Sequence, residues 1–175
     1  MVLMEIFLSD KAFAGIVVAA IEAYHDECIG LLLGYKTPNR IVIEDCIVYQ
    51  SAKRRPSEVE PIWNREIKIR DIIPKLIHLQ PLGYFHSHTQ WGSCRAKAEL
   101  SESDIDTIRP TEVEVIVAVN NGRRSVKWYE TRNHGLAGTI GRYHISLAAF
   151  YKKKNGEVKQ YRISCPYALG FDYAF

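Results

Sequence analysis

Two Asn-Gly dipeptides, Asn121-Gly122 and Asn155-Gly156, each stand between two strand-like runs, and they restrict the fold more than any other feature of the chain. Asparagine and glycine both tolerate a positive φ angle, which the tight turns of β-hairpins require. A hairpin pairs neighbouring strands antiparallel, so the second half of the chain should form a mostly antiparallel sheet. The predicted hairpins join residues 113–119 to 124–130, and residues 142–151 to 157–164.

The first half of the chain predicts a buried helix followed by buried strands. Ser9 precedes residues 10–27, which are mostly apolar, and its hydroxyl can cap the first turn of such a helix. Two apolar runs, 28–35 and 40–50, follow and are predicted to be strands. The polar residues 51–60 are predicted to form a loop.

Residues 61–80 fit two patterns. Trp63, Ile67, Ile73 and Ile77 repeat on one helical face, whereas residues 66–70 alternate as in a strand. We favour a helix that Pro74 kinks or breaks.

A short strand at 81–88 and a short helix at 101–108 complete the pattern. The fold class predicted from these elements is α/β (α+β), with a mixed, mostly antiparallel sheet flanked by helices.

Length and composition place the chain among ordinary globular domains. With 175 residues, of which 47% are hydrophobic and 25% charged, residues 1–175 should form one domain with its own core. The net charge of +3 is too small to indicate nucleic-acid binding. Short basic clusters such as Arg123-Arg124 are typical of solvated loops, although they could meet an acidic partner.

Cysteine usage and the apolar segments indicate a cytoplasmic protein. The four cysteines are dispersed without a Cys-x-x-Cys pair, as expected for reduced thiols. Residues 1–5 lack a basic leader, so we expect no signal peptide. The most apolar stretch, 12–21, is shorter than the roughly 20 residues that cross a bilayer, so we expect no membrane partner.

His86 and His88 end the apolar run 81–88 and are separated by one residue. Alternate residues of a strand project from the same face, so the two imidazoles should lie together. Imidazole is the commonest zinc ligand, and a catalytic zinc usually has three protein ligands and one open position. Asp104, in the first turn of the predicted helix, is the best candidate for the third ligand.

Each of these motifs also has a simpler explanation. A His-x-His pair alone is often structural. Ser101 and Asp104 match a capping box, which needs only to satisfy backbone N–H groups at a helix start.

Glu27 stands between the predicted buried helix and the predicted buried strand. An ionised carboxylate is costly there unless it has a partner or a function. Beside a zinc site it could take a proton from water and pass it to a leaving amine. From its position alone, Glu27 could equally end a helix in solvent.

Together the motifs resemble the JAMM (MPN+) zinc metalloproteases, in their compact prokaryotic type. The family pattern is a Glu before a G-x-L-x-G strand, then H-x-H, then S-x-x-D. This chain has Glu27 before the sequence GLLLG, then His86-Ser87-His88, then Ser101 to Asp104. The resemblance implies an α/β core similar to that of cytidine deaminases, with the metal at a sheet edge.

The resemblance also implies roles for these residues. His86, His88 and Asp104 would bind Zn²⁺, Glu27 would be the general acid/base, and Ser101 would donate a hydrogen bond to the oxyanion. The implied activity is that of a metallopeptidase, a deubiquitinase-like isopeptidase. It would hydrolyse the peptide or isopeptide bond after the C-terminal tail of a ubiquitin-like or sulfur-carrier protein.

Other functions stay open at this point. One is a non-catalytic MPN-type interaction domain, and another is a small-molecule amidohydrolase that uses the same zinc and Glu27. The oligomeric state is also open, and a homo-oligomer is possible.

The segment between His88 and Asp104 departs from the family pattern. It is longer than is usual, and Thr89 and Leu100 stand where the family usually has prolines. Trp91 in this loop could clamp a substrate tail, although a surface aromatic is the simpler explanation. Cys94 could fill the fourth zinc position and give a closed structural or redox site, or it could be a free surface thiol.

Overall fold

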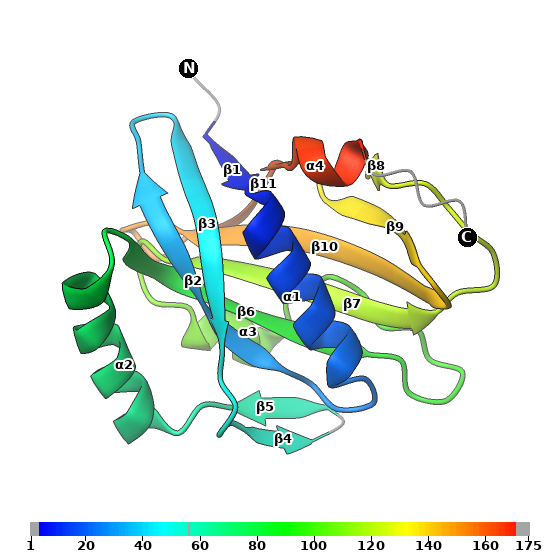
Figure 1. Cartoon of the computed structure of the whole chain (residues 1–175), viewed down its shortest axis with the longest axis horizontal. Coiled ribbons are helices and arrows are strands. Elements are labelled where there is room, and N and C mark those ends of the chain that lie inside the picture. Colours follow the sequence, from blue (N-terminus) through cyan, green and yellow to red (C-terminus); the bar gives the residue numbers. More distant parts are fainter. Residues whose placement is uncertain (1–3, 56, 171–175) are drawn as a thin grey trace.

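A ten-stranded sheet forms the body of the computed structural model, which describes residues 4–55 and 57–170 (Figure 1). Its strands run in the order β12-β1-β3-β2-β6-β7-β10-β9-β8, and β11 pairs with the rest of β10. β1 pairs in parallel with β3 and β12, and β6 pairs in parallel with β7, while the other neighbours in this sheet are antiparallel. The structure therefore confirms a mixed, mostly antiparallel sheet. Its strands are β1 (Glu5–Leu8), β2 (Ile29–Lys36), β3 (Arg40–Val48), β6 (Gln80–Thr89), β7 (Val113–Asn121), β8 (Tyr129–Glu130), β9 (Leu136–Ile140), β10 (Tyr143–Lys152), β11 (Val158–Tyr161) and β12 (Ile163–Ser164).

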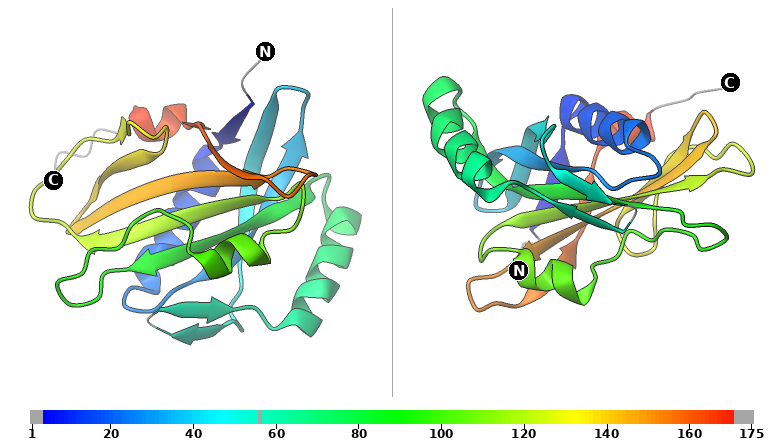
Figure 2. Two further views of the ribbon diagram at one scale, coloured as in Figure 1. Left: turned by 180° about the vertical axis from the view of Figure 1, so that it is seen from behind. Right: turned by 90° about the horizontal axis from the view of Figure 1, so that it is seen from below.

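Helix α1 (Asp10–Glu22) covers one face of the sheet, and the short helix α3 (Glu102–Thr107) lies on the opposite side (Figure 2). The predicted N-cap is confirmed, because the Ser9 hydroxyl oxygen accepts a hydrogen bond of 3.1 Å from the Ala12 N–H. The helix ends at Glu22, earlier than predicted, so the segment up to Glu27 is free to turn toward the sheet. A further short helix, α4 (Pro166–Leu169), contacts α1.

Strand β2 is buried on both faces, as its continuous apolar run predicts. Leu32 faces the larger core beneath α1, whereas Leu31 and Leu33 face a smaller core that includes Ile73 of helix α2 (Trp63–Leu76). The alternation follows from the two-residue period of a strand. β2 therefore lies between two packed layers, and its first residues lead directly into the candidate site.

Strand β6 has a bulge just before the two histidines. The register against β2 shifts between Leu32 and Leu33, and Gly83 has a φ of 143°. A Cβ at Gly83 would lie 1.9 Å from the Val113 carbonyl oxygen, so only glycine fits this close approach to β7.

Residues 63–76 form the predicted helix α2, but the predicted apolar face is wrong. Trp63 and Ile67 are about half exposed, and the helix packs through Ile73 and the fully buried Glu66. Sequence periodicity missed this because a charged residue occupies the buried stripe. Pro74 lies in the last turn, and the helix ends two residues later at Leu76.

Of the two predicted hairpins, the second is correct and the first is wrong. β10 and β11 pair antiparallel around Gly156, which has a φ of 87°. Asn121 instead stays within β7 and pairs with Tyr143 of β10. A turn with a positive φ occurs instead at Gly141, which lies between the antiparallel strands β9 and β10.

Residues 51–60, predicted to be a loop, contain a second small sheet. β4 (Lys53–Arg55) pairs antiparallel with β5 (Glu58–Glu60). Val59 packs against the smaller core, which explains why this polar segment is ordered as a hairpin. In the part of the chain that the structure describes, no helix has the length and apolarity to span a membrane.

Candidate metal centre

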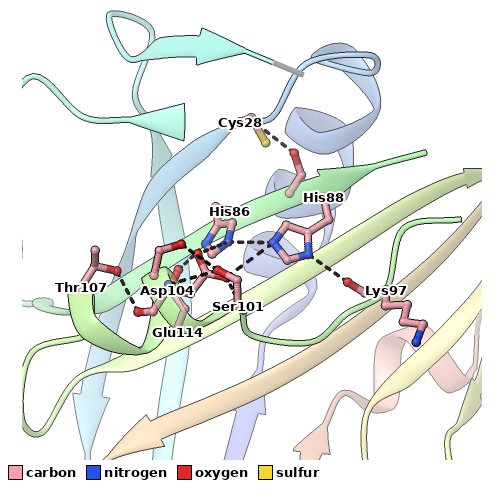
Figure 3. A network of polar contacts seen from close by, with 10 residues as sticks. Cys28, His86, His88, Lys97, Ser101, Asp104, Thr107 and Glu114 are labelled. Carbon is pink, nitrogen blue, oxygen red and sulfur yellow. Dashed lines mark hydrogen bonds and ion pairs between the residues drawn. The ribbon is translucent and has the colours of Figure 1, made fainter. Parts of the chain in front are cut away.

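His86 and His88 project from the end of β6 toward Asp104 of α3 (Figure 3). The ligand atoms of these three residues all lie within 4.8 Å of one another. The two Nε2 atoms are 3.1 Å apart, and the Asp104 oxygens lie 3.4 Å from His86 Nε2 and 3.8 Å from His88 Nε2. The structure thus brings together the three residues that the sequence singled out as metal ligands.

The Nδ1 atom of each imidazole lies within hydrogen-bond distance of an acceptor. His86 Nδ1 lies 2.7 Å from a Glu114 carboxylate oxygen, and His88 Nδ1 lies 2.9 Å from the Lys97 carbonyl oxygen. A carbonyl oxygen only accepts, so His88 Nδ1 carries a proton, and an ionised Glu114 assigns the same tautomer to His86. In their neutral forms both rings then direct Nε2 lone pairs at the same point, where a cation relieves their repulsion.

The spacing and chemistry of these three groups fit a zinc ion. Zinc–nitrogen bonds of about 2.0–2.1 Å in tetrahedral geometry separate neighbouring ligand atoms by roughly 3.3 Å. The Nε2–Nε2 distance of 3.1 Å and the distance of 3.4 Å from His86 Nε2 to Asp104 Oδ1 are close to that value. Two imidazole nitrogens and one carboxylate oxygen also form a ligand set that zinc accepts with a fourth position open.

Asp104 forms the predicted capping box and also directs one oxygen toward the histidines. The capping box is present: Ser101 N–H donates to Asp104 Oδ2 at 2.7 Å, and Asp104 N–H donates to Ser101 Oγ at 3.2 Å. Oδ1 is the oxygen nearer to His86. The cap therefore aims the carboxylate at the histidines, and the two explanations do not exclude each other.

The charges around His86 favour a positive charge at this point. Burial lowers the pKa of His86, but hydrogen bonds to Asp104 and Glu114 outweigh burial and raise that pKa to about 10. Burial raises the pKa of Asp104, yet its hydrogen bonds to His86 and Ser101 lower it overall. A proton or a metal ion can supply the charge that these two carboxylates stabilise.

Glu27 is buried in the same cleft, which has a volume of about 290 Å³. It lies two residues before Ile29, the first residue of β2, which pairs with His86 across the sheet. Burial raises the pKa of Glu27 to about 7, although the charge of His86 opposes this rise. The alternative that Glu27 ends a helix in solvent is therefore wrong, since α1 ends earlier and this side chain is 8% exposed.

Two elements far from the histidines in sequence form the remaining walls of the cleft. β5 contributes Glu58, Val59 and Glu60, and the start of α2 contributes Trp63. Among the described strands β5 pairs with β4 alone, so β5 is an edge strand of the small sheet.

Sequence reasoning missed two groups that orient the histidines, Glu114 and the carbonyl of Lys97. Glu114 left a signal, because it is the lone charged residue in the apolar run 113–119 of β7. It is 5% exposed, and a buried carboxylate requires a partner. Nothing in the sequence indicates the role of the Lys97 carbonyl, because every residue has a backbone carbonyl.

Cys94 and Trp91 lie in the long loop, away from the three ligands. They pair with each other across a turn, with the Trp91 N–H donating to the Cys94 carbonyl and the Cys94 N–H donating to the Trp91 carbonyl. Both side chains are exposed, and neither residue lines the cleft. Cys94 is not in the group of clustered ligands found among the described residues. The structure thus does not bring Cys94 to the fourth zinc position, nor Trp91 to the cleft.

A buried ionic network supports β6 beneath the cleft. Arg70 of α2 donates to the Tyr84 hydroxyl at 2.7 Å and pairs with Glu66 at 3.3 Å, and it also pairs with Glu112. Tyr84 is bound to Glu66 as well and lines the cleft. The network therefore fixes α2 and the start of β7 against the strand that carries the histidines.

Comparison with known proteins informs the fold but not the activity. No family model and no curated protein match the chain. Solved structures do match, among them the solution structure of protein DSY2949 from Desulfitobacterium hafniense. That protein is 18% identical, with 91% of this chain and 92% of that chain covered and a TM-score of 0.62. At such low identity the similarity extends to the fold alone.

Proposed function

We propose that this chain is a zinc-dependent peptidase or isopeptidase of the JAMM (MPN+) type, with the cytidine-deaminase-like core of that family. Its substrate would be the peptide or isopeptide bond after the C-terminal tail of a ubiquitin-like or sulfur-carrier protein. The observation that carries the proposal is the grouping of His86, His88 and Asp104 in one cleft with the buried Glu27. A non-catalytic interaction domain has no need of this complete set.

His86, His88 and Asp104 would hold the zinc ion. Zinc at this position supplies Lewis acidity, which polarises a carbonyl group and lowers the pKa of water. Glu27, with its pKa near 7, is suited to take a proton from the attacking water and to return it to the nitrogen of the leaving amine. Glu27 would thus transfer the proton that the water loses to the product amine.

Ser101 would stabilise the oxyanion of the tetrahedral intermediate. Its Oγ already accepts a hydrogen bond from the Asp104 N–H, so its own proton is available for donation. The neighbouring Ser103 Oγ lies 2.9 Å away and can share that proton before substrate arrives. A donor held by a helix cap needs little reorganisation during the reaction.

The edge of β5 would be the binding place for an extended tail. A peptide that pairs with this edge as an added strand would run along the cleft wall formed by Glu58, Val59 and Glu60. Backbone hydrogen bonds of this kind suit a flexible C-terminal tail, because they do not depend on its side chains.

Cleavage assays with matched variants test the proposal. The substrates are a linear fusion and a lysine conjugate of a ubiquitin-like protein, and the enzymes are wild type, Glu27→Gln and Asp26→Asn. Asp26 is the exposed neighbour of Glu27 and serves as the control. We expect Glu27→Gln to lose a factor of about 10² or more in rate, and Asp26→Asn to keep wild-type activity. Equal rates for wild type and Glu27→Gln would contradict the proposal.

A further inference from the structure

A second hollow, of about 470 Å³, lies elsewhere on the surface and is lined mainly by basic and aromatic side chains. Its residues are Arg95, Arg123, Arg124, Val126, Tyr129 and His144, which we call the arginine hollow. None of them lines the cleft of the metal centre. The arginine hollow is therefore a separate site, and its function does not depend on the proposed peptidase activity.

The three arginines face one concavity. Among the residues that the structure describes, no acidic residue lines the arginine hollow. Across residues 4–55 and 57–170, none of the ion pairs involves Arg95, Arg123 or Arg124. Like charges gathered in this way repel one another, and a bound anion would relieve the repulsion.

Arg95 is carried by a loop segment that is fixed to the end of β7. The side chain of Asn120, which is 2% exposed, accepts from the Ala96 N–H at 2.8 Å and donates to the Ala96 carbonyl at 3.1 Å. Both backbone groups of the residue next to Arg95 are thus held by one buried amide, which limits the motion of this part of the loop.

Arg123 and Arg124 lie in a second loop that is fixed independently. The Gly122 N–H donates to the Arg142 carbonyl at 2.7 Å. On the other side, Thr139 Oγ accepts from the Val126 N–H at 2.7 Å and donates to the Val126 carbonyl at 3.0 Å. Hydrogen bonds therefore anchor the chain on both sides of the two arginines. The backbone beneath all three guanidinium groups is preorganised before any ligand binds.

His144 and Tyr129 add neutral polar groups to the arginine hollow. Burial and the nearby charge of Arg95 lower the pKa of His144, so its imidazole is neutral at pH 7. Tyr129 is 45% exposed, so its phenol ring is accessible to a ligand. These groups can donate further hydrogen bonds without adding to the repulsion.

We propose that the arginine hollow binds a phosphate-class oxyanion, carried either by a small ligand or by a phosphorylated side chain of another protein. Guanidinium groups match tetrahedral oxyanions because their planar forks donate two parallel hydrogen bonds. A compact concavity with three such forks suits one multiply charged group. An acidic polypeptide or a nucleic acid strand would instead need a longer basic surface.

Titration of the full-length protein with inorganic phosphate, followed by backbone amide NMR shifts, tests this proposal. We expect saturable shifts at residues 123–126 and 144, and a binding constant that weakens as salt rises. Arg95→Gln and Arg124→Gln should each weaken binding about tenfold or more, because each removes charge-assisted hydrogen bonds. Arg142→Gln is the control, since Arg142 is exposed, bonds to Tyr143 and does not line the arginine hollow.

Two phosphomonoesters, a nucleoside monophosphate and a phosphoserine peptide, distinguish the source of the group. Tighter binding of the nucleotide indicates a small ligand, and tighter binding of the peptide indicates a phosphoprotein; both outcomes support the oxyanion site. Shifts confined to the metal cleft, or equal affinity in wild type and Arg124→Gln, would overturn it. Binding of polyglutamate at the arginine hollow without binding of phosphate would also overturn it, in favour of an acidic partner.

Discussion

The Nδ1 atom of His88 lies 2.9 Å from the carbonyl oxygen of Lys97, so the long loop between the histidines and Asp104 orients one of the proposed ligands. The length of this loop is the main departure from the family pattern. In the structure the loop is tied to the site at Lys97 and to β7 through Asn120. Extra loop residues therefore need not disturb the metal centre, because their entropic cost is small once the ends are fixed.

Replacing Glu114 should weaken zinc binding. In Glu114→Ala the His86 Nδ1–H loses its acceptor, and such changes typically lower metal affinity by about 10–100-fold. Glu114→Gln keeps an acceptor oxygen and should lose less. Competition with a chelator of known affinity measures both values. Equal zinc affinity in wild type and Glu114→Ala would show that Glu114 does not support the site.

Activity should fall as the pH decreases through the pKa of Glu27. A general base must be ionised, and burial raises the pKa of Glu27 to about 7. A bound zinc ion stabilises the carboxylate, so we expect the acidic limb of kcat/KM at or below about pH 7. The pH profile of wild type, compared with the residual activity of Glu27→Gln, measures this. A limb that persists unchanged in Glu27→Gln would assign it to another group.

Loss of Arg70 should destabilise the fold. Arg70→Met removes the cation that Glu66 and Glu112 share and leaves Glu66 with Arg109 alone, 3.7 Å away; breaking a buried ionic network in this way costs up to about 3–5 kcal/mol. Urea unfolding of the variant measures the change in the free energy of unfolding. Arg65→Met, on the exposed side of the same helix, is the matched control and should change stability by less than about 0.5 kcal/mol. Equal stabilities for the two variants would contradict a structural role for the network.

Cys94→Ser should leave zinc content and activity unchanged. The thiol is exposed and is absent from the cluster of ligand atoms in the described part of the chain. Zinc stoichiometry and the rate of peptide cleavage measure the effect. A loss of bound zinc in this variant would restore the hypothesis of a site closed by Cys94.

The parts of the fold that local chemistry determines could be predicted from the sequence. The Ser9 cap, the buried strand β2 and the projection of His86 and His88 from one strand end all follow from side-chain pattern alone. The turn predicted at Asn121-Gly122 was wrong, because this dipeptide shows only that the backbone can adopt a positive φ there and does not require a turn. Tertiary pairing of β7 with β10 kept Asn121 in a strand and placed the turn at Gly141.

Buried polar residues account for most of what periodicity could not predict. Glu66 lies in the stripe of α2 that packs inward; its partner Arg70 is on the same helix, but its partner Tyr84 comes from β6. Glu114 likewise meets His86 only through the parallel pairing of β6 with β7. Partners that come from another element cannot be identified from the sequence, because they meet only in the folded sheet.

The most direct measurement is zinc stoichiometry in wild type and in four variants: His86→Ala, His88→Ala, Asp104→Ala and Glu27→Gln. We predict one zinc ion per chain in wild type and in Glu27→Gln, and a loss of bound zinc in each of the other three. Folding of every variant is checked by its circular dichroism spectrum. Wild-type protein that binds no zinc, or ligand variants that retain it, would contradict the account.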